Sequence, residues 1–137
     1  MMRILIFGAR DFSDKIIIDN FILSLEKDTV IIEGEAKGAD SIARDCAIFH
    51  GLTVEKYPAD WKIGRKAGPI RNKQMLVEGK PDYVVGYSND IKSSRGTRNM
   101  LKQALKAGIE AYLNISDAID IELGVGQVKL EDLELGE

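Results

Sequence analysis

Five short apolar runs alternate along the chain with segments whose apolar residues recur at helical spacing. The runs cover residues 3–7, 29–32, 52–57, 82–87 and 109–113. Between them, the spacing and the capping residues predict helices from a Ser13 cap to about Leu25, from about Asp40 to Gly51, from Pro69 to about Gly79, and from about Met100 to Gly108. Strands that alternate with amphipathic helices are typical of parallel βαβ units.

This alternation predicts an α/β protein with a three-layer, Rossmann-like fold. We expect a mostly parallel five-stranded sheet in the order 3-2-1-4-5, with helices on both faces. A chain of 137 residues with 45% hydrophobic content is long enough for one well-buried core and short for two. We expect this single domain to span residues 1–113.

Charge divides the chain at about the same point. Residues 1–113 carry 18 Lys and Arg against 15 Asp and Glu, whereas residues 114–137 carry one Lys against seven acids, which leaves a net charge of −3. The mildly basic body suits a small anionic ligand better than a long nucleic acid. In the acidic extension, apolar and polar residues alternate over 121–123 and 128–130. We expect a short hairpin there, packed on a neighbouring subunit or over a sheet edge, and hence a homo-oligomer.

The composition also limits the setting of the protein. No apolar run approaches the roughly 18 residues of a membrane span, and the start "MMRILIF" lacks the pattern of a secretory signal, so we expect a cytoplasmic protein with no membrane partner. Cys46, the single cysteine, lies on the apolar stripe of its helix, which favours core packing. One cysteine and one histidine, His50, do not make a standard zinc site, and we expect no metal and no cofactor.

The stretch "EGEAKGAD", residues 33–40, directly follows the second apolar run. A strand, a glycine-bearing loop and a helix start form a geometry in which free N–H groups and the positive helix end can meet an anion. Alternatively, Gly34 and Gly38 only form a tight turn and Asp40 only caps the helix. Glu33 ends the strand, where a carboxylate can bond ribose hydroxyls or act as a base.

Two other strand ends carry similar residues. The first strand ends in "GARDFS", residues 8–13, and the fourth is followed by "SNDIKSSRGT", residues 88–97. In the expected strand order, the topological switch point lies between strands one and four. The three loops should therefore converge on one crevice at the carboxyl ends of the strands, which favours a ligand site over independent turns.

The segment "PADWKIGRKAGPIRN", residues 58–72, is long for a simple crossover and rich in basic residues. Loops of this length are often functional, and Trp61 could stack on a base while Arg and Lys meet phosphates. The alternative is that Trp61 packs against the sheet edge and the cations form a solvated face.

Four motifs together resemble the YspA-like (YAcAr) branch of the SLOG superfamily over residues 3–113: "GARDF", "EGEAKGAD", "YPADWKIGRKAGPIRNKQM" and "SSRGTRNMLKQALKAGI". This Rossmann-like group also includes the DprA/Smf and Lonely Guy proteins, and the resemblance implies strand-end loops that bind a nucleotide or nucleotide-derived ligand. In the Lonely Guy pattern, an arginine and a glutamate are associated with cleaving a base from a ribose phosphate. Here Arg71 and Met75 match that pattern, whereas Met100 stands where the glutamate would fall. A thioether cannot move a proton, so the sequence leaves open whether the protein is an enzyme.

The leading hypothesis is a protein that senses or sequesters a nucleotide-derived ligand, ADP-ribose-like or cyclic. The alternatives are a nucleotide N-glycosidase or phosphoribohydrolase, with Glu33, Asp60 or Arg71 as catalytic candidates, and binding of single-stranded DNA, which the acidic pI of about 5.3 disfavours. The expected ligand-binding residues lie at the strand ends and in the middle segment: Gly8, Ala9, Arg10, Asp11, Phe12, Glu33, Gly34, Gly38, Ala39, Asp40, Asp60, Trp61, Gly68, Pro69, Arg71, Asn72, Ser94, Gly96 and Thr97.

Overall fold

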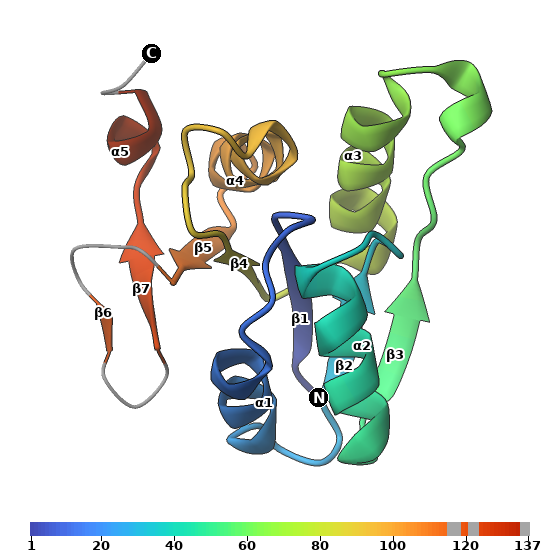
Figure 1. The fold of residues 1–137 in the computed structure, drawn as a ribbon, viewed down its shortest axis with the longest axis vertical. Coiled ribbons are helices and arrows are strands. Elements are labelled where there is room, and N and C mark those ends of the chain that lie inside the picture. The colour runs from blue at the N-terminus through green and yellow to red at the C-terminus, as the bar shows by residue number, and fades with distance from the viewer. Residues whose placement is uncertain (115–118, 121–123, 135–137) are drawn as a thin grey trace.

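The computed structural model describes residues 1–114, 119–120 and 124–134. One sheet holds the strands in the order β3-β2-β1-β4-β5-β7-β6 (Figure 1). The strands are β1 (Arg3–Gly8), β2 (Val30–Glu33), β3 (Thr53–Lys56), β4 (Tyr83–Tyr87), β5 (Glu110–Leu113), β6 (Ile119–Asp120) and β7 (Val125–Val128). The helices are α1 (Lys15–Leu23), α2 (Ala39–Phe49), the 3-10 helix η1 (Trp61–Ile63), α3 (Ala67–Gly79), α4 (Arg95–Lys106) and α5 (Leu130–Glu134).

The predicted Rossmann-like fold is confirmed, and β1 to β5 are parallel in the predicted order. The predicted number of five strands is wrong, because two antiparallel strands extend the sheet beyond β5. Strand β7 pairs with β5, and β6 pairs with β7. The predicted alternation over 121–123 lies outside the described residues. The alternation over 128–130 is not one strand, since β7 ends at Val128 and α5 begins at Leu130.

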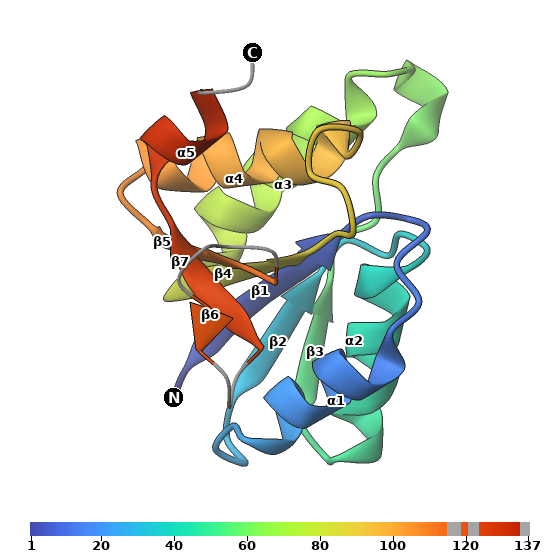
Figure 2. The same cartoon turned by 60° about the vertical axis from the view of Figure 1, so that its left-hand side comes forward.

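Helices cover both faces of the sheet, which gives three layers (Figure 2). Alternate residues of β1 point to opposite faces. Ile4 and Ile6 pack in the core beneath α1 and α2, whereas Leu5 and Phe7 pack in the core beneath α3 and α4. Each layer is therefore closed by the apolar stripe of its own helices.

Two helix starts differ from the sequence prediction. Helix α1 begins at Lys15 with Asp14 as its cap, because the Asp14 carboxylate rather than Ser13 accepts a hydrogen bond of 3.3 Å from Ile17 N–H. Helix α3 begins at Ala67, two residues before Pro69, so Arg71 lies in its second turn and not in its first. The predicted helix start at Pro69, which would have put Arg71 in the first turn, is therefore wrong.

The ends of β1, β2 and β4 approach one another closely. A Cβ atom at Gly8 would collide with the carbonyl oxygen of Tyr87 on β4 and lie 2.7 Å from Ala39 Cβ on α2. Gly38 has a φ of 78°, and a Cβ atom there would meet the carbonyl oxygens of Ala9 and Arg10. Glycine at these two positions lets the first two strand-end loops lie against each other beside β4.

Candidate functional site

A cavity of about 710 Å³ opens at the carboxyl ends of β1 and β4. Its walls come from the end of β1, the start of α2, the segment from η1 into α3, and the start of α4. This is the switch point where the sequence analysis expected the loops to converge. The expected binding residues that line it are Gly8, Ala9, Arg10, Asp11, Asp40, Trp61, Gly68, Pro69, Arg71, Asn72, Ser94, Gly96 and Thr97.

The remaining expected residues do not line the cavity: Phe12, Glu33, Gly34, Gly38, Ala39 and Asp60. Phe12 is buried against Tyr87 in the core, with a ring-centroid distance of 5.5 Å. Asp60 caps η1 by accepting a hydrogen bond of 3.2 Å from Lys62 N–H. It forms no ion pair with Arg71.

Several lining residues were not among the expected binding residues: Phe7, Ala36, Arg65, Met75, Ser93, Arg95, Asn99 and Met100. Of these, Ala36, Ser93 and Arg95 belong to the loops that were expected to converge on the crevice. The basic composition of the middle segment was the signal that could have identified Arg65. The apolar members, Phe7, Met75 and Met100, belong to the core between the sheet and α3 and α4. Met100 is fully buried there, so the side chain at the Lonely Guy glutamate position forms part of an apolar floor.

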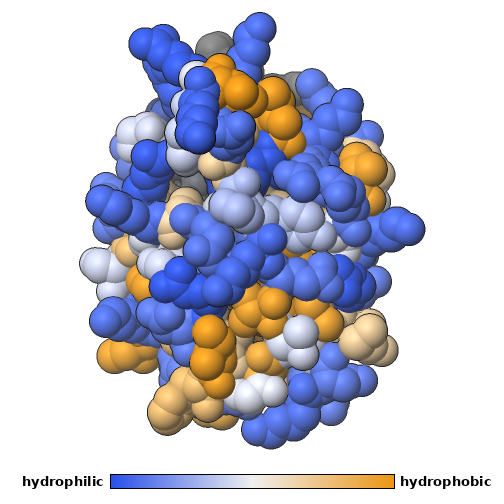
Figure 3. Space-filling view, turned by 90° about the vertical axis from the view of Figure 1, so that its right-hand side faces the viewer, coloured by the Kyte–Doolittle hydropathy of each residue, from blue (hydrophilic) through white to orange (hydrophobic). Residues whose placement is uncertain are grey.

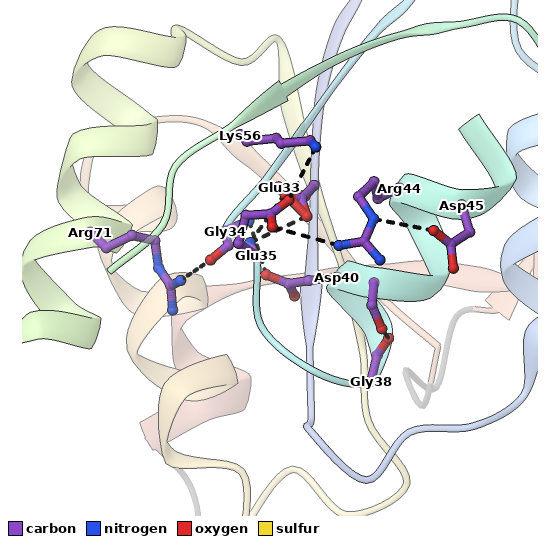
Figure 4. A network of polar contacts seen from close by, with 10 residues as sticks. Glu33, Gly34, Glu35, Gly38, Asp40, Arg44, Asp45, Lys56 and Arg71 are labelled. Carbon is purple, nitrogen blue, oxygen red and sulfur yellow. Dashed lines mark hydrogen bonds and ion pairs between the residues drawn. The ribbon is translucent and has the colours of Figure 1, made fainter. Parts of the chain in front are cut away.

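The β2–α2 loop, residues 34–38, is closed by Asp40 in the first turn of α2 (Figure 4). The Asp40 Oδ2 accepts a hydrogen bond of 3.0 Å from Gly34 N–H, and the N–H groups of Ala36 and of Asp40 itself also favour the carboxylate. Asp40 is only 3% exposed. Burial raises the pKa of its carboxyl to about 6, against the opposing effects of Arg71 and these N–H groups. Because the loop's donors already bond to a protein carboxylate, the structure favours the turn-and-cap interpretation of this loop over a phosphate site.

Glu33 ends β2 with its side chain fully buried. Its two carboxylate oxygens lie 3.2 and 3.1 Å from the Glu35 N–H that donates to them. Burial, then the negative charges of Glu35 and Asp40, raise the pKa of Glu33 to about 8. Glu35 forms ion pairs with Arg44 at 3.6 Å and Lys56 at 3.9 Å (Figure 4). Glu33 is therefore a largely protonated acid near neutral pH, enclosed behind the loop rather than presented to the cavity.

Two consecutive residues of α3 connect it to the β2–α2 loop and to α4. The Arg71 guanidinium donates through Nη1 to the carbonyl oxygen of Gly34 (Figure 4). Asn72 donates through Nδ2 to Asn99 Oδ1 at 3.1 Å and to Gly96 O at 3.4 Å on α4. Burial lowers the pKa of Arg71, an effect that the nearby charge of Asp40 opposes and that of Arg10 reinforces. Arg71 thus combines a structural contact with a position on the cavity wall.

The start of α4 differs from the start of α2 because no side chain caps it. Within the described residues, the N–H groups of Arg95, Gly96 and Thr97 donate to no protein acceptor; the first bonded one in this helix is Arg98 N–H, which donates to Ser94 O at 2.9 Å. Thr97 lines the cavity, is 3% exposed, and its Oγ1 has no hydrogen-bond partner. Free donors at a helix start form an anion-binding geometry.

Four arginines face this cavity, Arg10, Arg65, Arg71 and Arg95, against the carboxyl groups of Asp11 and Asp40. In the part of the chain that the structure describes, Arg10, Arg65 and Arg95 form no ion pair. The Arg10 guanidinium instead lies over the Trp61 ring, 5.0 Å from its centroid. The cavity therefore carries unbalanced positive charge.

The cysteine and the histidine lie elsewhere, between α1 and α2. His50 Nε2 lies 2.8 Å from Asp19 Oδ1, and burial raises the pKa of the half-buried Cys46 thiol to about 11. A thiol with a raised pKa is a poor nucleophile at neutral pH, which fits a packing role. Among the described residues, no three His, Cys, Asp or Glu side chains gather closely enough to hold a metal ion. No helix of the same residues is long and apolar enough to cross a membrane.

Comparison with known proteins gives a family and a fold. Residues 2–64 match the family YAcAr, described as YspA, cpYpsA-related SLOG, which confirms over those residues the resemblance that the sequence shows over residues 3–113. No match was found among curated proteins. The X-ray structure of DNA processing protein A (DprA) from Streptococcus pneumoniae is similar, with a TM-score of 0.67 and 18% identity over 90% of this chain. The chain spans about half of that structure, 53% of its length, and at this identity the similarity concerns the fold alone.

Proposed function

We propose, from the match of residues 2–64 to the YspA, cpYpsA-related SLOG family, that the protein binds a nucleotide or nucleotide-derived ligand in the cavity at the ends of β1 and β4. The observation that carries the proposal is the start of α4, where free N–H groups adjoin a cavity lined by arginines that form no ion pair, and where the buried Thr97 Oγ1 has no partner. Together these groups are donors for a phosphate. Met100 stands where the Lonely Guy pattern has a glutamate. We therefore favour a role in sensing or sequestering an ADP-ribose-like or cyclic nucleotide over its cleavage.

The dimensions and chemistry of the cavity support a ligand larger than a single phosphate. Cavities of roughly 300–1,000 Å³ are typical of small-molecule sites, and this one has about 710 Å³. The donors at the start of α4 suit an anionic group, whereas Trp61, 51% exposed, offers an aromatic surface. A nucleotide combines both kinds of group in one molecule.

Thermal-shift and equilibrium-binding measurements with ADP-ribose, nucleoside monophosphates and cyclic nucleotides test the proposal. We expect at least one of them to raise the melting temperature. The Lys106→Ala variant is the matched control, since Lys106 is exposed at the far end of α4 and should leave the response unchanged. Absence of any stabilisation by the whole panel contradicts the proposal.

A second candidate function is hydrolysis of the bond between a base and a ribose phosphate. The observation that favours it is Asp40, a carboxyl group that lines the cavity with a pKa raised to about 6 and could take a proton from an attacking water. Of the catalytic candidates from the sequence, Glu33 and Asp60 do not line the cavity, whereas Arg71 does. Release of free base from nucleoside monophosphates, lost in Asp40→Asn, would identify this activity.

Single-stranded DNA is a third candidate, suggested by the fold similarity to a protein named DNA processing protein A. The net charge of −3 works against a long polyanion. Oligonucleotide affinity that falls steeply with salt would support this candidate, and affinity for mononucleotides alone would exclude it.

A further inference from the structure

The segment around η1 projects above the cavity and reaches back to it through one aromatic ring. Hydrophilic residues surround a small apolar group at the upper end of the face in Figure 3, the end where η1 lies in Figure 1. Trp61 is the single tryptophan of the chain. Its ring lies beside the start of α3, since a Cβ atom at Gly68 would be 3.5 Å from Trp61 Cη2. The guanidinium of Arg10, from the end of β1, lies over the ring.

Arg10 has no stronger partner than this ring. In the described part of the chain it forms neither an ion pair nor a side-chain hydrogen bond, and its side chain is exposed. A cation over an exposed aromatic ring is worth about 0.5–1 kcal/mol, less than a charge-assisted hydrogen bond to an anion. An anionic group in the cavity would therefore outcompete Trp61 for Arg10.

A second guanidinium acts on Arg10 from across the cavity. The positive charge of Arg10 disfavours the charged form of Arg71, so the two groups repel each other through the space between them. An anion in that space relieves this repulsion and attracts both groups. Its binding would therefore draw the Arg10 guanidinium off the Trp61 ring and uncover one face of that ring.

We propose that Arg10 makes the Trp61 ring available for base stacking only to ligands that also carry an anionic group, so that phosphate and base are recognised jointly. This inference rests on the proposed function and deepens it. The ligand class is a nucleotide with an accessible base face and at least one phosphate. A nucleoside must displace Arg10 from the Trp61 ring without offering it an anionic partner. A sugar phosphate attracts Arg10 but has no base to stack on Trp61.

Affinities for three probes, adenosine 5′-monophosphate, adenosine and ribose 5-phosphate, test the coupling, together with the matched guanine, cytosine and uracil compounds. Arg10→Ala should weaken the nucleotide by roughly 10-fold and strengthen the nucleoside by about 2-fold or more, because the ring is now uncovered. Arg65→Ala is the matched control: Arg65 also lines the cavity but does not cover Trp61. It should weaken the phosphate-bearing probes and leave the nucleoside unchanged.

Trp61→Ala and intrinsic fluorescence complete the test. Loss of the ring should weaken nucleotide and nucleoside by roughly 10-fold and leave ribose 5-phosphate unchanged. Stacking of a base should change the fluorescence of the single tryptophan in the unaltered protein. Two results would overturn this inference and leave the proposed function standing. One is an affinity for nucleotide that Trp61→Ala does not change. The other is an equal loss of affinity for nucleotide and nucleoside in Arg10→Ala. No binding of any nucleotide overturns the proposed function as well.

Discussion

The β2–α2 loop and the β4–α4 loop, residues 88–94, have the same plan and opposite chemistry. Both join a parallel strand to a helix beside the cavity, and both lie next to a glycine at or near the helix start. At the start of α2, Asp40 accepts hydrogen bonds from the loop's own N–H groups. In the β4–α4 loop, N–H groups such as those of Ser88 and Asp90 also bond to the protein, but the N–H groups of residues 95–97, in the first turn of α4, have no protein acceptor within the described residues. The protein itself supplies the acceptor at the start of α2, whereas the start of α4 has N–H donors available to a ligand.

The difference follows from one side chain near each helix start. A carboxylate in the first turn of α2 satisfies both the helix dipole and the loop donors. In α4 the first turn holds Arg95 and Gly96, whose side chains offer no acceptor, and Thr97, whose Oγ1 has no hydrogen-bond partner. The Ser94 hydroxyl instead bonds to Ser88 Oγ at 2.7 Å and Asp90 O at 2.9 Å. A glycine and a helix start are thus insufficient to identify an anion site. Whether the N–H groups remain available to an anion depends on the acceptors near the helix start.

A substitution of Arg71 should have the largest effect, since Arg71 lines the cavity and also bonds to Gly34 O in the β2–α2 loop. Arg71→Ala should weaken a phosphate-bearing ligand by roughly 2–4 kcal/mol and its dephosphorylated analogue much less. The lost bond to Gly34 should also lower the melting temperature of the unliganded protein. Calorimetric titration of each ligand pair measures the difference, with Lys106→Ala as the control. Equal losses of affinity for both ligands would show that Arg71 only supports the β2–α2 loop and does not contact the phosphate.

Amide hydrogen exchange compares the two loops directly. Gly34 N–H donates to a buried carboxylate, whereas Gly96 N–H is exposed and donates to no described group. We expect Gly34 to exchange on the order of 30- to 100-fold more slowly than Gly96, after correction for intrinsic rates. Asp40→Ala should remove most of that protection, whereas Asp45→Ala, an exposed acid on the same helix, should not. Equal rates in the unaltered protein would refute the distinction between the loops.

Glu33 gives the closed loop a pH dependence. In the unfolded chain this carboxyl loses its proton above about pH 4.5, but in the folded protein it keeps the proton up to about pH 8. The folded state binds more protons in this window, so the free energy of unfolding should fall as pH rises from about 4.5 to 8. Glu33→Gln mimics the neutral acid and should be roughly 1–2 kcal/mol more stable than the unaltered protein above pH 8.

Denaturant unfolding between pH 4 and pH 9 measures this effect. The variant should match the unaltered protein at pH 4, where both carry a neutral group at position 33. Glu78→Gln, on the exposed side of α3, is the control and should leave the pH profile unchanged. A parallel profile for Glu33→Gln would show that Glu33 is ionised in the folded protein.

The sequence predicted the sheet better than the site, for physical reasons that particular residues show. Strand order and layers follow from apolar periodicity, which is local and strong in runs such as residues 3–7. The strands added by the acidic tail were harder to predict, because β6 has only two residues and the apolar contacts of Val125 and Val128 are with distant elements. In the sequence, Glu33 and Asp40 are both acids at the ends of one strand-to-helix loop, and nothing local separates their roles. Only the three-dimensional contacts distinguish the one that lines the cavity from the one sealed behind the loop.

Thr97 gives the smallest and most selective test, because its Oγ1 is buried without a partner in the unliganded protein. Thr97→Val removes the hydroxyl and keeps the shape. Affinity for a phosphate-bearing nucleotide should fall by about 1 kcal/mol, the usual worth of one hydrogen bond, while the melting temperature stays equal or rises because no bond is lost in the free protein. Thr29→Val is a matched control, since Thr29 Oγ1 is also buried and unpartnered but lies outside the cavity. It should have the same effect on stability and none on affinity. If the two variants bind the nucleotide equally well, the ligand does not use the hydroxyl at the start of α4, and the contrast between the two loops does not extend to Thr97.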